Sequence, residues 1–126
     1  FRLLQAGAPL LALGRNRYFQ ERDGLSLDAG PFVAALEYAA GVQAELLGKP
    51  APALFAAALE SAGCPPTAAA MIGDDVEADI NGALAAGLRG VLVRTGKYRP
   101  GDEAHLAPGG ELADDVGTAA TLLGIA

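Results

Sequence analysis

Short apolar runs alternate with segments of helical length along this chain, and this alternation constrains the fold more than any other feature. The runs of strand length are 10–13, 44–47, 68–72 and 90–93, with a further short one near 112–116. The segments expected to form helices are 31–40, 53–62, 76–86 and 118–123. Strands separated by helices of this length form βαβ units, whose strands are parallel. The sequence therefore predicts an α/β, Rossmann-like fold with a parallel sheet and helices on both faces.

Residues that start and stop helices support these boundaries. Asp28 is placed to cap the helix at 31–40, and Pro31 suits its first turn. Glycines follow expected helices at Gly41, Gly63 and Gly87, where the left-handed conformation of a helix end favours glycine. The pattern indicates helices of about three turns between short strands.

Composition and charge exclude several classes of protein. The net charge is −6 and the pI is about 4.6, which argues against a nucleic-acid surface, because phosphates require a stripe of Lys and Arg. No apolar run approaches the roughly 18 residues of a membrane span, so no membrane association is expected. Cys64 is the single cysteine, and a chain without an internal disulfide is expected in a reducing compartment, here the cytoplasm.

Three carboxylates cluster where the expected strand 68–72 ends. Asp74 and Asp75 follow Gly73, and Asp79 lies four residues after Asp75, on the same face of a helix. Acids this close repel one another unless a cation neutralises them, and their oxygens suit Mg²⁺. Alternatively, Asp74 and Asp75 cap the following helix and favour its positive N-terminus. The spacing alone leaves both interpretations open.

A lysine lies at the end of an earlier strand. Lys49 stands between Gly48 and Pro50, on stiff backbone, where its ammonium group is either a donor to phosphate or a solvated loop residue. Loops that follow parallel strands meet at one edge of the sheet, so Lys49 is expected to lie near the acidic cluster. Lysine and Mg²⁺ together stabilise the charge that develops in phosphoryl transfer.

The remaining polar residues are interpreted mainly as surface. The loop after strand 90–93 carries Lys97 and Arg99, which are expected to be part of a solvated connection rather than substrate ligands. His105 is expected to be exposed, and Cys64 has no basic neighbour in the sequence that would activate it as a nucleophile. A charged surface face is also expected at Arg15, Arg17, Tyr18 and Arg22.

Taken together, these motifs resemble those of haloacid dehalogenase (HAD) superfamily phosphatases, most closely the capped NagD-like subfamily. The residues that carry the resemblance are Gly48-Lys49-Pro50, Gly73-Asp74-Asp75-Val76-Glu77-Ala78-Asp79, Ala86-Gly87 and Val93-Arg94-Thr95-Gly96-Lys97. The similarity extends over about 10–123. It implies a Mg²⁺-dependent phosphatase that hydrolyses a small phosphorylated molecule through a phosphoaspartate intermediate. A homodimer is compatible with this subfamily.

The resemblance implies a role for each matched residue. Lys49 corresponds to the catalytic lysine that steadies the phosphoryl group and the nucleophile, so it also binds substrate. Asp74 corresponds to the acid that holds Mg²⁺. Asp75 and Asp79 correspond to supporting acids of the metal site, acting directly or through water.

The nucleophile of the family is missing from this chain. The superfamily uses an Asp-x-Asp-Gly motif after its first core strand, whereas Asp23-Gly24 follows no apolar strand and Asp114-Asp115 lies late in the chain. The chain starts at Phe1 and its single methionine is Met71. We therefore expect the C-terminal part of a longer enzyme, with 1–23 the end of a cap domain and 24–126 the second half of the hydrolase core.

Two alternatives to an enzyme remain at this point. Without its nucleophile the chain is expected to be inactive in isolation, and a catalytically inactive structural or assembly domain is the alternative to a phosphatase part. A signalling receiver domain also combines acids, threonine and lysine at strand ends. Its lysine follows the acidic pair, however, whereas Lys49 precedes Asp74 here. The order of the motifs argues against a receiver domain.

Overall fold

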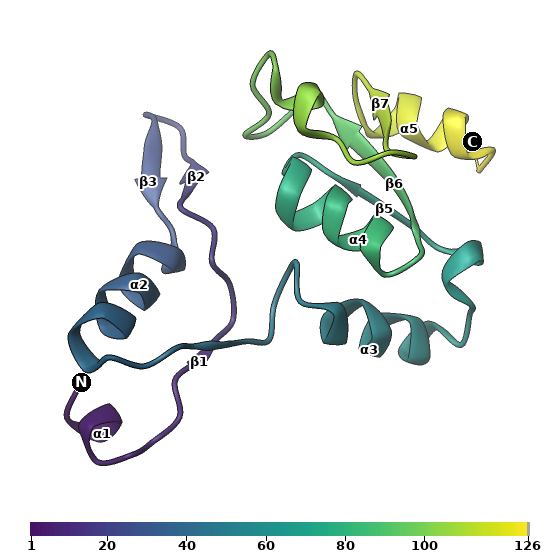
Figure 1. Cartoon of the computed structure of the whole chain (residues 1–126). Helices are drawn as coiled ribbons and strands as arrows, with labels where there is room; N and C mark the ends of the chain where they lie inside the picture. The colour runs from purple at the N-terminus through teal and green to yellow at the C-terminus, as the bar shows by residue number, and fades with distance from the viewer. Residues whose placement is uncertain (126) are drawn as a thin grey trace. The chain divides into compact units, whose positions relative to one another are not determined.

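The computed structural model describes residues 1–125 and divides the chain into two compact units, Phe1–Lys49 and Pro50–Ala126. Figure 1 shows their helices and strands. The first unit contains α1 (Arg2–Gln5), β1 (Leu11–Ala12), β2 (Tyr18–Gln20), β3 (Leu25–Leu27), α2 (Ala29–Ala40) and β4 (Glu45–Leu46). The second contains α3 (Pro52–Ala62), η1 (Pro66–Ala68), β5 (Ala70–Gly73), η2 (Val76–Asn81), α4 (Gly82–Ala85), β6 (Arg89–Val93), η3 (Asp102–His105), β7 (Glu111–Ala113) and α5 (Val116–Leu123).

The first unit combines a parallel strand pair with a hairpin and one longer helix. β1 pairs with β4 in parallel, and β2 pairs with β3 in an antiparallel hairpin. The side chain of Asp28 accepts the backbone N–H of Ala29, and Gly41 ends α2 in the left-handed conformation. The start and stop signals read from the sequence are thus confirmed for this helix.

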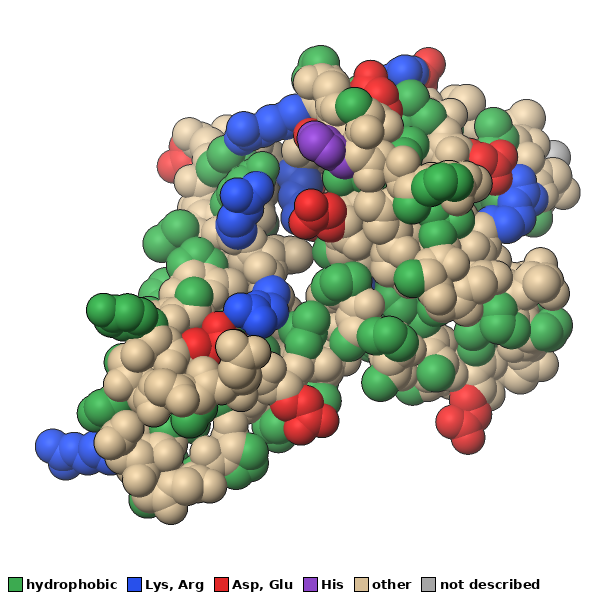
Figure 2. All heavy atoms as spheres, viewed as in Figure 1, with side chains coloured by type: hydrophobic (Ala, Val, Ile, Leu, Met, Phe, Trp, Pro, Cys, Tyr) green, Lys and Arg blue, Asp and Glu red, His purple; other side chains and the backbone are tan. Residues whose placement is uncertain are grey.

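Few apolar side chains are buried within the first unit. Val33 and Ala12 are buried, whereas large side chains such as Leu13 and Tyr38 are 83% and 92% exposed. Figure 2 shows many hydrophobic side chains at the surface of the molecule. Because hydrophobic stabilisation scales with the apolar area removed from water, this unit gains little of it from its own contacts.

A three-stranded parallel sheet forms the centre of the second unit, with the strand order β5-β6-β7. The register places Ile72 beside Val91, and Val91 beside Glu111. A buried hydrophobic cluster joins the sheet to α5. It consists of Val91, Val93, Ala113 and, from α5, Ala119, and Ile72 and Leu123 pack against it. The predicted parallel sheet is confirmed.

Helices cover both faces of this sheet. Alternate residues of β6 point to opposite faces, so Val91 and Val93 face α5, whereas Gly90 faces the fully buried Ile80 of η2. Segments η2 and α4 both pack against β6, on the Gly90 side. The chain therefore has the α/β class and the doubly covered sheet that the sequence predicted.

Three local features differ from the sequence-based expectation. The segment 76–86 forms a π-helical turn, η2, followed by the short helix α4, instead of one α-helix. Val116 begins helix α5 instead of extending the last strand. The polar stretch around Tyr18 forms a hairpin with residues 25–27, which the apolar pattern did not indicate. Within residues 1–125, no helix has the length and apolar content needed to cross a membrane.

A capping carboxylate makes the stability of α5 dependent on pH. Asp115 accepts the backbone N–H of Thr118 at 2.7 Å, and this bond, with one from the Thr118 side chain, lowers the pKa of Asp115. A lowered pKa stabilises the fold above the ordinary aspartate pKa, and this stabilisation is lost as the pH falls through the folded-state value. We expect wild type to melt above Asp115→Asn at about pH 6, with the difference shrinking towards about pH 2. A difference in melting temperature that stays constant over this range would contradict the assignment.

Candidate active site at the carboxyl ends of β5 and β6

Asp74 lies at the carboxyl end of β5, held by the loop that follows β6. Its Oδ2 accepts the backbone N–H of Lys97 at 2.7 Å. Gly96 makes this approach possible: its φ of +60° is strained for other residues, and a Cβ there would lie 1.9 Å from Asp74 Oδ2. One carboxylate oxygen is thereby fixed in place, which leaves Oδ1 for a ligand.

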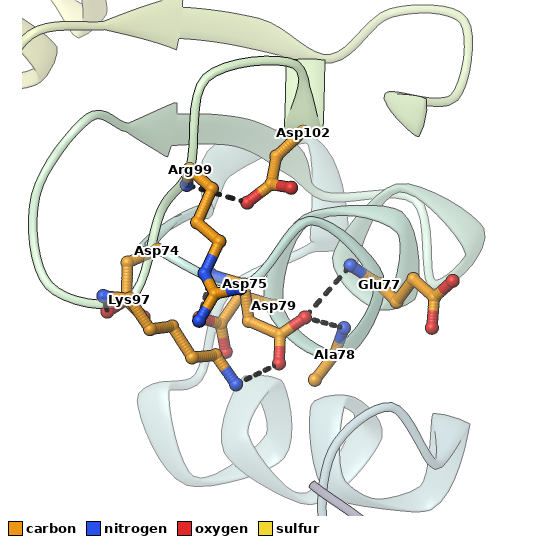
Figure 3. A network of polar contacts seen from close by, with 8 residues as sticks. All are labelled: Asp74, Asp75, Glu77, Ala78, Asp79, Lys97, Arg99 and Asp102. Atoms are coloured by element: carbon orange, nitrogen blue, oxygen red, sulfur yellow. Dashed lines mark hydrogen bonds and ion pairs between the residues drawn. The ribbon is translucent and has the colours of Figure 1, made fainter. Parts of the chain in front are cut away.

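Asp75 is occupied by two kinds of partner (Figure 3). Its Oδ1 accepts the backbone N–H groups of Glu77 and Ala78, both at 3.0 Å, so it caps η2. Its Oδ2 forms an ion pair with Lys97 Nζ, and only 17% of the lysine side chain and 18% of the aspartate side chain are exposed. Burial raises the pKa of Asp75, but the bonds from Lys97, Ala78 and Glu77 outweigh it and leave the pKa below its ordinary value.

The third carboxylate is buried behind the first two. Asp79 is 4% exposed, and its Oδ2 accepts the backbone N–H of Asp75 at 3.2 Å. The carboxylate packs on Gly73, where a Cβ would lie 2.2 Å from Asp79 Oδ2. Asp79 thus fixes the backbone between β5 and η2.

The loop from Lys97 to Glu103 is organised by its own acids. Asp102 accepts the backbone N–H of Arg99 at 2.8 Å, and Glu103 accepts both the Tyr98 hydroxyl at 2.6 Å and the Gly101 N–H at 2.9 Å. The bond to Glu103 raises the pKa of Tyr98 and lowers the pKa of Glu103. The loop is therefore ordered by specific hydrogen bonds.

The Arg99 side chain extends from this loop toward the Asp74–Asp75 side of the site, as Figure 3 shows.

Lys97 corrects the interpretation of this loop as a solvated connection. The acidic cluster was expected to need a cation to neutralise it, and the Lys97 ammonium group supplies a positive charge to Asp75. A signal was present in the sequence, because residues 95–97 directly follow a strand parallel to the one that precedes Asp74. The capping interpretation holds for Asp75, and Asp74 instead accepts a hydrogen bond from the loop after β6.

Lys49 belongs to the first unit, three residues after the end of β4. It is half-buried, and the preceding Gly48 lies so close to the Leu13 carbonyl that a Cβ would be 1.8 Å from its oxygen. This close approach anchors the backbone before Lys49 against the segment after β1. Its expected position beside a phosphoryl group stays a prediction.

The residues in the second unit fit a cation held mainly by one protein carboxylate. Within residues 1–125, no group of three or more His, Cys, Asp or Glu side chains is arranged to hold a metal ion by itself. Asp74 offers a carboxylate oxygen at a strand end, whereas both oxygens of Asp75 already have positively polarised partners. Such a site suits Mg²⁺, which commonly takes one or two carboxylates and completes its shell with water and substrate.

Comparison with known proteins identifies the family. Residues 46–119, more than half of the chain, match the model of the HAD-hydrolase-like family. The chain belongs to this family. The resemblance drawn from the motifs around Lys49 and Asp74 is thereby confirmed.

Curated relatives of this HAD-like chain are longer proteins. The phospholysine phosphohistidine inorganic pyrophosphate phosphatase of Xenopus laevis is 57% identical over 96 residues, which cover 76% of this chain and 36% of the relative. The haloacid dehalogenase-like hydrolase domain-containing protein 2 of Bos taurus is 52% identical over 108 residues, covering 86% and 42%. The chain thus spans about two-fifths of the length of these relatives.

Solved structures show the same fold. A 4-nitrophenylphosphatase from Thermotoga maritima superposes with a TM-score of 0.83 and 30% identity, covering 95% of this HAD-like chain and 47% of that one. A glycerol phosphate phosphatase from Mycobacterium tuberculosis in complex with magnesium gives a TM-score of 0.78 and 32% identity, covering 91% and 35%. The α/β architecture is therefore that of known phosphatase structures.

Proposed function

We propose that this chain forms the metal- and phosphate-binding half of a Mg²⁺-dependent phosphatase that acts on a small phosphorylated molecule. The observation that carries the proposal is Asp74 at the end of a parallel strand, with one oxygen fixed by the Lys97 N–H. Its relatives include proteins named as phosphatases of several phosphorylated compounds, and one is in complex with magnesium. The shared chemistry of these names is a phosphoryl group on a small carrier.

In this proposal each charged residue of the site has a separate role. Asp74 holds Mg²⁺, which supplies Lewis-acid stabilisation of the phosphoryl oxygens. Lys49 donates to the same phosphoryl group and neutralises charge that grows in the transition state. Asp75 and Asp79 hold the turn after β5 and keep Asp74 in place. Both interact with the backbone of that turn, so they support the site without needing to reach the substrate.

The nucleophilic aspartate of the phosphoaspartate intermediate comes, in this proposal, from outside the 126 residues. Residues 1–23 are then the end of a cap domain and 24–126 the second half of the core. The isolated chain is expected to bind a cation without turning over substrate, since Lys49 and Asp74 form no covalent intermediate by themselves. A homodimer and a cytoplasmic location complete the proposal.

Lys49 provides one test of the function. In the longer protein that contains this chain, Lys49→Ala should lower kcat for 4-nitrophenyl phosphate by about 10²–10³-fold, as expected for removing one donor to a transition-state charge. Lys49→Arg, which keeps the positive charge, should retain more activity. Full activity in Lys49→Ala would remove Lys49 from the catalytic machinery.

Removing the metal provides a second test. Treatment of the longer protein with a chelator should abolish hydrolysis of 4-nitrophenyl phosphate, and an excess of Mg²⁺ should restore it, because without the cation the Asp74 carboxylate repels the phosphoryl group and Lys49 alone does not neutralise its charge. Activity that persists after chelation would overturn the Mg²⁺ dependence. The release of inorganic phosphate gives a readout independent of the nitrophenol colour.

A further inference from the structure

A single residue, Lys97, engages both neighbouring carboxylates at the end of β5. Its backbone N–H donates to Asp74 Oδ2 at 2.7 Å, and its ammonium group forms an ion pair with Asp75 Oδ2. Figure 3 shows the lysine side chain extending alongside both acids. Two adjacent and chemically identical side chains therefore receive different partners from the same loop residue.

The difference matters for the charge that each acid presents. Asp74 is held by a neutral backbone N–H, which brings no positive charge to its carboxylate. Asp75 meets a lysine ammonium on one oxygen and two backbone N–H groups, of Glu77 and Ala78, on the other. A cation approaching the end of β5 thus finds one carboxylate with its charge available and one whose charge is already neutralised.

We propose that Lys97 is a positioning residue that reserves direct cation contact for Asp74 and, by holding Asp75 away, makes the site select Mg²⁺ over Ca²⁺. The inference rests on the proposed function, since it takes Asp74 as the metal-binding acid. Lys97 acts through Asp75 and needs no contact with the substrate. Its backbone bond to Asp74 keeps the loop in place for this role.

The selectivity follows from the different demands of the two cations. Mg²⁺ keeps several waters and needs few carboxylates in octahedral geometry, whereas Ca²⁺ takes six to eight oxygens in a flexible shell. An additional, unneutralised carboxylate therefore favours Ca²⁺ more than Mg²⁺. Without the positive charge of Lys97, the carboxylate of Asp75 would be unneutralised at Oδ2 and would become such an additional ligand.

The test measures cation binding to the longer protein that contains this chain, independent of turnover. Mn²⁺ is bound first, and its displacement by Mg²⁺ or Ca²⁺ is followed by the electron paramagnetic resonance signal of free Mn²⁺. Lys97→Met removes the charge but keeps the length, and Lys97→Arg keeps the charge. We expect Lys97→Met to shift the ratio of the two dissociation constants toward Ca²⁺ by about tenfold, the lower end of what outer partners of metal ligands contribute. Lys97→Arg should keep the wild-type ratio.

The Asp75→Asn background supplies the decisive control. There Lys97→Met has no carboxylate to release, so the shift toward Ca²⁺ should vanish. A shift that persists in this background, or an unchanged ratio in Lys97→Met, overturns the role of Lys97. Circular dichroism establishes that each variant is folded, and Lys97→Arg provides a charged variant if Lys97→Met does not fold. Asp74→Asn should abolish Mn²⁺ binding; if it does not, the proposed metal site itself is wrong, a failure distinct from that of Lys97.

Discussion

Replacing Asp74 by Asn in the longer protein of the proposed function is expected to abolish its proposed phosphatase activity, with kcat falling by at least about 10³-fold. The side-chain amide keeps an oxygen that can accept the Lys97 N–H, so the loop after β6 stays in place. In the proposed function the change removes the negative charge that would hold Mg²⁺, and losing several kcal/mol of Lewis-acid stabilisation corresponds to about three powers of ten in rate. Initial rates with 4-nitrophenyl phosphate at saturating Mg²⁺ measure the loss.

Asp114 supplies the matched control for this substitution. It follows β7 as Asp74 follows β5, but its side chain is 74% exposed and pairs with Arg94. Asp114→Asn should leave kcat within about twofold, since an exposed ion pair contributes little. Comparable losses in both variants would mean that a general loss of charge or fold, and not the metal, explains the effect.

Truncating Ile80 is expected to produce the largest loss of stability. Its side chain is fully buried and packs against Gly90 of β6, where an added Cβ would lie 2.8 Å from Ile80 Cγ2. Ile80→Ala removes three buried carbons from a contact between η2 and the sheet. We expect the free energy of unfolding to fall by about 2–5 kcal/mol, a large share of the 5–15 kcal/mol typical of a domain. Urea denaturation followed by circular dichroism measures the change.

An exposed isoleucine near the end of the chain provides the control, because it tests whether the loss of stability comes from the buried contact of Ile80 or from removing any isoleucine side chain. Ile125 is 73% exposed, so Ile125→Ala should change the free energy of unfolding by less than about 0.5 kcal/mol. If Ile80→Ala were equally mild, the contact between η2 and β6 would contribute little to the stability of the second unit.

The parts of the fold that could be predicted from sequence depend on local signals. Asp28 marks a helix start through its side chain, and Gly41 and Gly63 mark helix ends through the left-handed backbone; the structure has these residues as caps, although α2 begins two residues before the expected start. The hairpin of β2 and β3 was missed because its short strands contain few apolar residues in alternation. The π-helical turn was missed because apolar periodicity does not separate a π-turn from an α-turn over six residues.

The sequence predicted which residues lie at the ends of the strands, but it did not predict which side chains pair with one another there. The positions of Asp74 and Asp75 follow from the end of an apolar strand. The ion pair of Asp75 with Lys97 joins residues 22 positions apart, and it depends on the path of the Gly96 turn. Both segments follow parallel strands and therefore lie at one edge of the sheet, but the sequence did not indicate that the Lys97 side chain would pair with Asp75.

The π-helical turn also indicates how the length of this segment can vary. Within η2, a wide turn accommodates one residue more than an α-helical turn would, between the strand end and the buried Asp79. Deleting one residue within η2 would let this wide turn close as an ordinary α-turn, so the side chains that follow would keep their orientation around the helix axis. A related sequence that is shorter by one residue at this point should therefore have a regular α-helix here, with the contacts between α4 and β6 unchanged.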